Sequence, residues 1–149
     1  MSQILTEASA TIKAPPEQVY AILADYRTGH PAILPKEYFH NLTVEAGGVG
    51  AGTIITVQMV VLGVERTFRL VVSEPEPGRV LMEVDEQAGS VTTFVVDPLA
   101  NGRHAQVTIR TETSASFGFT GMIESVMIPL TLRPIYQQEL KLLADYVHA

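Results

Sequence analysis

The feature that most constrains this chain is a series of short β-like segments followed by one long helical segment. In residues 3–13 small or apolar residues alternate with polar ones, a period of two that predicts a strand with one buried face. Six further strands are predicted over residues 39–46, 53–62, 64–74, 79–86, 90–97 and 103–114. The connections between them are short and rich in Gly and Pro, which favours an antiparallel meander.

Two short helices are predicted between the first and second strands. Pro15 and Pro16 suit a helix start, because proline in the first turn removes only an amide that would be unpaired anyway. Apolar residues at helical spacing follow, and this helix should end near Asp25. Residues 26–36 contain one glycine and two prolines, so at most a short irregular helix fits there.

The last segment, residues 121–148, has apolar residues at helical spacing over its whole length. At 1.5 Å per residue this helix would be about 40 Å long, enough to cross a sheet. Pro129 and Pro134 lie inside it, and each removes a backbone donor, so a kink or a break is expected.

Length, charge and composition limit the possible functions. The 149 residues predict one domain spanning 1–149. Sixteen Asp and Glu against ten Lys and Arg give a net charge of −6, and without a basic cluster this argues against a nucleic-acid partner. The chain has no cysteine, and its four histidines lack metal-ligand spacing, so neither a metal nor another cofactor is expected. No signal sequence or membrane-spanning apolar run is visible, which predicts a cytoplasmic protein without stable membrane insertion.

The order of elements and several local motifs resemble the START-like superfamily, also called SRPBCC, and within it the polyketide cyclase/dehydrase-like proteins. The motifs are the opening strand, residues 14–25 with Ala14-Pro15-Pro16-Glu17, the glycine-rich residues 45–53, and the turn at residues 74–79. The resemblance covers nearly the whole chain. It implies an α+β helix-grip fold, in which a seven-stranded antiparallel sheet wraps a long C-terminal helix, with two short helices after the first strand. Many members have a tryptophan after the first helix, and this chain has none.

The polar candidates lie in residues 26–36, on strands and on the last helix. The glycines in residues 47–52 lack the lysine of a phosphate-binding loop and precede a strand, so a hairpin with positive φ is favoured. His30 could be a general base or a loop-packing side chain. Arg66 is expected to point inward and to pair with a ligand anion or with Glu83. With Tyr26 and Tyr136, His30 and Arg66 are the groups expected to orient a ligand.

The apolar candidates are Met and Phe side chains on faces expected to look toward the inside of the fold. Such side chains can line an adaptable cavity, or they can simply close-pack as a core. The resemblance favours the cavity. The predicted apolar ligand-binding residues are Phe39, Met59, Phe68, Met82, Phe94, Met122, Val126 and Met127.

Three functions remain open from the sequence. The first is binding of a hydrophobic or amphipathic small molecule, such as a lipid, an aromatic polyketide or an isoprenoid, in a cavity between the sheet and the C-terminal helix. The second is a cyclase or dehydratase that uses the same cavity, with His30 or a strand carboxylate moving a proton. The third is a protein-interaction or chaperone-cofactor-like module, for which residues 117–122 could supply an exposed apolar patch or a homodimer contact.

Overall fold

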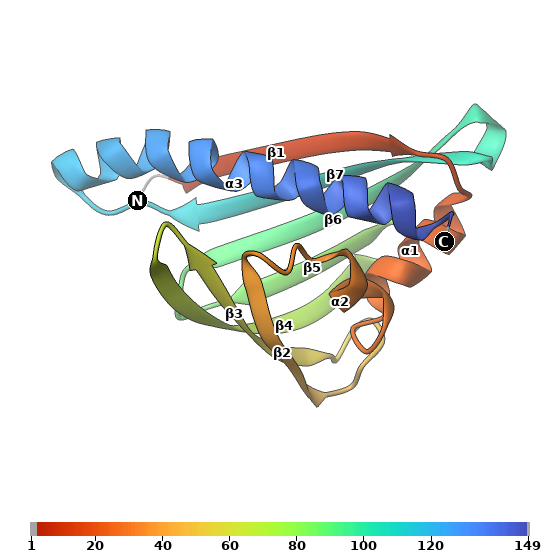
Figure 1. The fold of residues 1–149 in the computed structure, drawn as a ribbon, viewed down its shortest axis with the longest axis horizontal. Coiled ribbons are helices and arrows are strands. Elements are labelled where there is room, and N and C mark those ends of the chain that lie inside the picture. Colours follow the sequence, from red (N-terminus) through yellow and green to blue (C-terminus); the bar gives the residue numbers. More distant parts are fainter. Residues whose placement is uncertain (1–2, 149) are drawn as a thin grey trace.

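The computed structural model describes residues 3–148, which form one sheet, three α-helices and one 3-10 turn (Figure 1). In chain order the elements are β1 (Gln3–Ile12), α1 (Pro16–Ala24), α2 (Gly29–Ile33), β2 (Phe39–Ala46), β3 (Ile54–Val61), β4 (Val64–Glu76), β5 (Val80–Asp85), β6 (Ser90–Leu99), the 3-10 turn η1 (Ala100–Gly102), β7 (His104–Ser114) and α3 (Gly118–Tyr146).

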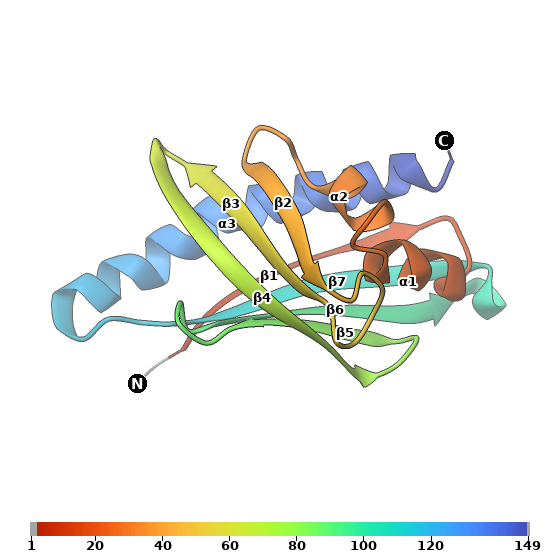
Figure 2. The ribbon, with the colours of Figure 1, turned by 90° about the horizontal axis from the view of Figure 1, so that it is seen from below.

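The seven strands form a single antiparallel sheet in the order β1-β7-β6-β5-β4-β3-β2. From β2 to β7 each strand pairs with the next one in the chain, as the short connections predicted. β1 pairs with β7 over its whole length, from Gln3 opposite Ser114 to Ile12 opposite Ala105. The sheet curves strongly, so that β2, β3 and β4 stand apart from β1 and β7 in both views (Figures 1 and 2). The predicted fold class is confirmed.

Alternation along the strands sets which face of the sheet is concave and buried. In β1, Ile4, Thr6, Ala8 and Ile12 are buried, whereas the residues between them are exposed or half-buried. α3 lies against this concave side along β1, and its Tyr136 hydroxyl reaches Thr111 of β7 (Figure 1). The helix continues through Pro129 and Pro134, so the structure does not break there, in contrast to one outcome expected from the sequence.

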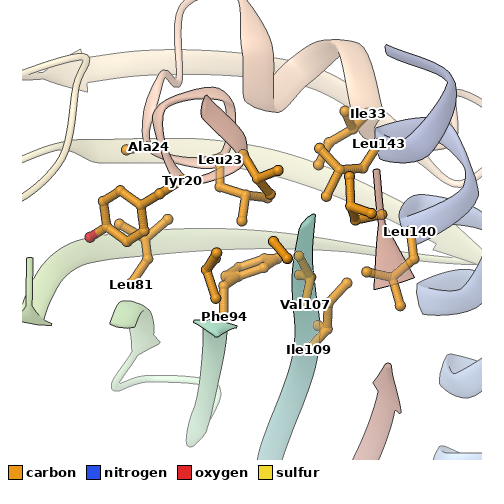
Figure 3. Close-up of a cluster of buried hydrophobic side chains, with 14 of the residues drawn as sticks. Tyr20, Leu23, Ala24, Ile33, Leu81, Phe94, Val107, Ile109, Leu140 and Leu143 are labelled. Atoms are coloured by element: carbon orange, nitrogen blue, oxygen red, sulfur yellow. The ribbon is translucent and has the colours of Figure 1, made fainter. Parts of the chain in front are cut away.

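The main core lies between α1, α2, the middle of the sheet and the second half of α3. Leu23, Phe94, Leu140 and Leu143 meet there, each at most 2% exposed (Figure 3). Full burial of side chains of this size contributes about 1.5–3 kcal/mol each. The second half of α3 is therefore anchored firmly on the sheet.

The glycine-rich loop after β2 positions the junction between α1 and α2. The amide of Tyr26 donates to the Gly48 carbonyl at 2.8 Å, and the amide of Gly50 donates to the Ala24 carbonyl at 2.9 Å. Gly48 and Gly50 both have positive φ, and a Cβ on Gly50 would lie 2.3 Å from the Glu74 carboxylate. The predicted positive-φ hairpin is confirmed, and its role is to hold Tyr26 in place.

Candidate ligand and acid–base site

A group of buried polar side chains lies on the concave side of the sheet, beside the main core. We call Tyr26, His30, Glu83, Tyr136 and Glu139 the polar cluster. They come from the α1–α2 junction, α2, β5 and α3, and each is at most 7% exposed. Burying polar and ionisable groups is costly unless they are hydrogen-bonded or charge-paired, so their partners determine what the site can do.

Glu83 is the centre of the cluster. The Tyr26 hydroxyl donates to Glu83 Oε2 at 2.6 Å, and His30 Nε2 lies 3.5 Å from the same oxygen. Burial and the adjacent Glu83 carboxylate raise the pKa of Tyr26 well above its ordinary value of 10.0. Tyr26 therefore remains a neutral hydrogen-bond donor to Glu83 at physiological pH.

The orientation of His30 is fixed by contacts on several sides. Nδ1 lies 2.7 Å from the carbonyl oxygen of Leu23, which can only accept, so Nδ1 carries a proton. The ring stacks on Tyr26 with centroids 4.4 Å apart and meets Phe94 edge-on at 5.4 Å. With Nδ1 occupied, Nε2 is the nitrogen left to exchange a proton with Glu83 or with a bound molecule.

Glu139 provides a second buried carboxyl close to Glu83. Burial and the charge of Glu83 raise the pKa of Glu139 well above its ordinary value of 4.5, and no hydrogen bond within residues 3–148 contributes to offset this shift. A carboxyl with a raised pKa favours its protonated form, which can donate a hydrogen bond or a proton.

Tyr136 lies one helical turn before Glu139 and joins a chain of hydroxyl groups. Its hydroxyl lies 2.6 Å from Thr111 Oγ1, which in turn lies 2.8 Å from Thr92 Oγ1. Burial raises the pKa of Tyr136, so this hydroxyl also stays neutral. Within residues 3–148 no group of three or more His, Asp or Glu side chains is arranged to hold a metal ion. The chemistry that these residues can perform themselves is hydrogen bonding and proton transfer.

Two surface hollows lie at one end of the sheet, which we call the open end. It carries the β3–β4 and β5–β6 turns, the start of β1 and the end of β7. A hollow of about 200 Å³ is lined by Arg66, Thr67, Phe68, Asp85, Gln87 and Ala88. A second, of about 360 Å³, is lined by Gln3, Ile4, Ala115, Ser116, Phe117, Gly118, Gly121, Met122 and Ser125.

The smaller hollow lies at the end of β5, the strand that carries Glu83. Asp85 lines it, and Glu83 points to the same face of the strand two residues earlier, about 7 Å further in. Phe68 and Leu70 of β4 lie on the same concave face and are half-buried. Glu83 of the polar cluster is therefore two residues along β5 from Asp85, which lines the surface hollow.

A family model described as "Polyketide cyclase / dehydrase and lipid transport" matches residues 3–148. This chain belongs to that family. No match is found among the curated proteins.

Solved structures place this family member among helix-grip proteins. The KanY protein, solved by NMR, is 28% identical, with a TM-score of 0.85 and full coverage of both chains. The Zhui aromatase/cyclase from Streptomyces sp. R1128 is 15% identical, with a TM-score of 0.75 over 99% of this chain and 94% of its own. A START superfamily protein from Mycobacterium smegmatis is 12% identical, with a TM-score of 0.71 over 97% of each chain. The resemblance inferred from the sequence is confirmed.

The structure brings part of the predicted site together. Tyr26, His30, Tyr136 and Phe94 lie in or against the polar cluster. Three more predicted residues, Phe39, Met59 and Phe68, are half-buried on the concave side.

Other predicted residues lie elsewhere. Arg66 is exposed at the open end, and Glu83, which we considered as its partner, contacts Tyr26 and His30 instead. Met82 is on the convex face, because Leu81, Glu83 and Asp85 are the buried residues of β5. Met122, Val126 and Met127 are 68%, 63% and 44% exposed, so the expectation that they face the interior is wrong.

Glu139 was missed, although the sequence contained a signal for it. It is the one carboxylate on the buried side of α3, between Tyr136, Leu140 and Leu143. A charged residue in an apolar helical stripe either has a partner or has a function.

None of the helices within residues 3–148 is long and apolar enough to span a bilayer.

Proposed function

We propose that this protein binds an amphipathic small molecule, of the aromatic polyketide, isoprenoid or lipid type, on the concave side of the sheet. The ligand would enter at the open end past Phe68, lie along Met59 and Leu70, and direct its polar group to Glu83 and Glu139. The observation that carries this proposal is a buried polar cluster inside a mainly apolar interior, with Glu83 two residues along β5 from Asp85, which lines a surface hollow.

The chemistry of the polar cluster favours a ligand with hydroxyl or carbonyl groups. A protonated Glu139 can donate to a carbonyl oxygen, while Glu83 can accept from a hydroxyl. Apolar burial would supply most of the affinity, at about 25 cal/mol per Å² removed from water. The family description, which names both polyketide chemistry and lipid transport, supports the same ligand class.

Thermal unfolding and native mass spectrometry test the proposal with two probes, oleate and 1,8-dihydroxyanthraquinone. A ligand at 100 times its Kd should stabilise the fold by about 2.7 kcal/mol. Glu83→Gln should weaken dihydroxyanthraquinone binding at least tenfold, because it changes the acceptor for the hydroxyl. The matched control is Glu65→Gln, an exposed carboxylate on β4, which should bind like the wild type. The proposal is wrong if neither probe raises the melting temperature.

A second candidate function is a cyclase or dehydratase acting in the same place. It is favoured by two buried carboxyls, Glu83 and Glu139, of which the charge of the first helps to raise the pKa of the second; a general acid and a general base can be formed from such a pair. Glu139 would donate a proton, and Glu83 or His30 Nε2 would accept one.

Turnover of a synthetic polyketone thioester separates the enzyme from the carrier. An enzyme should lose at least 100-fold in kcat in Glu139→Gln while binding the substrate as before. His30→Ala with unchanged turnover would remove His30 as the base and leave Glu83. If the wild type binds the substrate but does not turn it over, the enzyme function is excluded and the carrier function remains.

We also propose that the protein works in the cytoplasm, without a nucleic-acid partner and without stable membrane insertion. The excess of acidic residues supports the exclusion of nucleic acids, since a net charge of −6 repels polyanions. Fractionation of native cells tests the location, and salt-dependent retention on immobilised DNA would contradict the exclusion of nucleic acids.

A further inference from the structure

The first half of α3 exposes an unusually large apolar surface. Six apolar side chains, which we call the α3 stripe, are between 44% and 75% exposed: Phe119, Met122, Ile123, Val126, Met127 and Leu130. Their spacing of three and four residues places them on one side of the helix. Phe117, just before the helix, is 82% exposed.

The α3 stripe faces away from the body of the protein. Helical periodicity places it roughly opposite the buried residues Gly121, Ile135 and Glu139. The first turns of α3 also extend past the ends of the strands in both views (Figures 1 and 2). Met122, at the edge of the stripe, also lines the larger hollow, whereas none of the six residues lines the smaller hollow.

The area of this surface is that of a protein interface. From the exposed fractions of Phe117 and the α3 stripe, about 800 Å² of mainly apolar surface faces solvent, more than the roughly 300–600 Å² of a typical largest patch. One partner in a standard interface also buries about 800 Å². A second protein surface of similar size would cover it.

Charge distinguishes a protein partner from a membrane. Helices that lie in a membrane interface carry Lys and Arg on their polar side. Residues 117–132 contain no Lys or Arg, and the one charged residue among them is Glu124. Together with the net charge of −6, this disfavours docking on an anionic lipid surface.

The positions of the α3 stripe are symmetric about its midpoint, between Glu124 and Ser125. Two copies of the stripe packed antiparallel would place Phe119 against Leu130, Met122 against Met127, and Ile123 against Val126 of the other copy. The paired segment would be about 17 Å long. Because these turns extend past the strands, two copies could meet here without contact between their sheets.

We propose that the protein forms a two-fold symmetric homodimer through antiparallel packing of the α3 stripes. Such an interface uses the same patch on both subunits, as closed dimers do. It lies outside the polar cluster, so each copy would keep its own site, open at the end beside the dimer contact.

Sedimentation velocity from 1 to 100 µM tests the association. The wild type should dimerise in this range, and Val126→Asp should raise the dimer Kd at least 100-fold, because it buries a charge near the centre of the contact. The matched control is Gln137→Asp, on the same side of α3 but in its second half, which should dimerise like the wild type. Circular dichroism checks that both variants are folded. A wild type that stays monomeric at 100 µM overturns the proposal.

Cysteine cross-linking tests the antiparallel register, since the chain has no cysteine of its own. The double variant Phe119→Cys/Leu130→Cys should form disulfide-linked dimers under mild oxidation, whereas Phe119→Cys alone should not, because the two copies of residue 119 would be about 17 Å apart. Efficient cross-linking of the single variant would contradict this register. If the wild type is monomeric and co-sediments with phosphatidylcholine vesicles, the α3 stripe binds a lipid surface and not a second copy of the protein.

Discussion

The two halves of α3 have opposite relations to the rest of the protein. The second half buries Tyr136, Glu139, Leu140 and Leu143 against the sheet and contributes to the polar cluster. In the first half Gly121 alone is buried, and the apolar side chains face solvent. The same helix thus combines a half that packs in the core and contributes to the polar cluster with a half whose apolar side chains are exposed.

The comparison shows why hydrophobicity alone does not identify a core. On the outward side of the second half the residues are polar, including Gln137, Lys141 and Asp145, as expected for a helix lying on a sheet. On the outward side of the first half they are apolar. A large contiguous patch of exposed apolar side chains, unlike a single exposed one, indicates a surface that another molecule covers.

The largest difference between the halves should be in stability. Leu143→Ala, at a fully buried position, should lower the free energy of unfolding by about 2–5 kcal/mol, because it removes buried methyl groups and leaves a cavity. Leu130→Ala, at a position 66% exposed, should change it by less than about 0.5 kcal/mol. Urea denaturation at low protein concentration measures both. Equal losses would show that the first half is packed as firmly as the second.

A smaller loss is expected from the hydrogen bond between Tyr26 and Glu83, which joins the α1–α2 junction to β5. Tyr26→Phe removes the hydroxyl and leaves the carboxylate without that donor, which should cost about 1–3 kcal/mol. A double-mutant cycle with Glu83→Leu, which removes the acceptor, isolates the pair. If the two changes are additive in urea denaturation, the contact contributes nothing to stability.

The buried carboxyl in the second half predicts a pH dependence. The folded protein holds the Glu139 proton more tightly than the unfolded chain does, because its pKa is raised. Between the unfolded value near 4.5 and the folded pKa, the folded state therefore binds more protons, and stability falls as pH rises.

Glu139→Gln should remove this dependence. The variant should be more stable than the wild type at pH 8.5, by about 1 kcal/mol or more, with the advantage shrinking toward pH 5. Thermal unfolding across this range measures it, with Glu65→Gln, an exposed carboxylate, as the control. A Glu139→Gln variant that gains nothing at high pH would mean that the wild-type carboxyl ionises without penalty.

The strands and their order could be predicted because their signals are local. Most strand ends lie within one or two residues of the predicted ones, since Gly and Pro turns and period-two alternation are fixed by the sequence itself. β5 shows where such signals fail. An apolar-inward rule would bury Val80, Met82 and Val84, yet the buried residues include Glu83 and Asp85.

The reason for this reversal lies mainly in residues distant in sequence, with the Ala88 amide, three residues after Asp85, as the local exception. Leu81 pairs with Phe94 inside the core, Glu83 receives the Tyr26 hydroxyl, and Asp85 receives the amides of Arg69 and Ala88. Buried carboxylates are tolerated where hydrogen-bond donors lie within reach, and most of these donors can be identified only from the fold. Departures from local patterns tend to mark functional sites, and here the departure and the candidate site coincide.

The smallest effect should come from Glu124, which fastens the start of the exposed half. Its carboxylate accepts from the amide and the hydroxyl of Ser116, at 2.8 and 3.2 Å, where Phe117 as the N-cap supplies no side-chain hydrogen bond. Glu124→Gln should destabilise the first turn of α3 by about 0.5–1 kcal/mol. The amide hydrogen-exchange rates of residues 118–121 should then rise about two- to fivefold. The measurement belongs in the Val126→Asp background, so that association does not mask it. Amides around Leu143 should exchange as before; faster exchange there would show that the two halves of α3 open together and that their separation is incomplete.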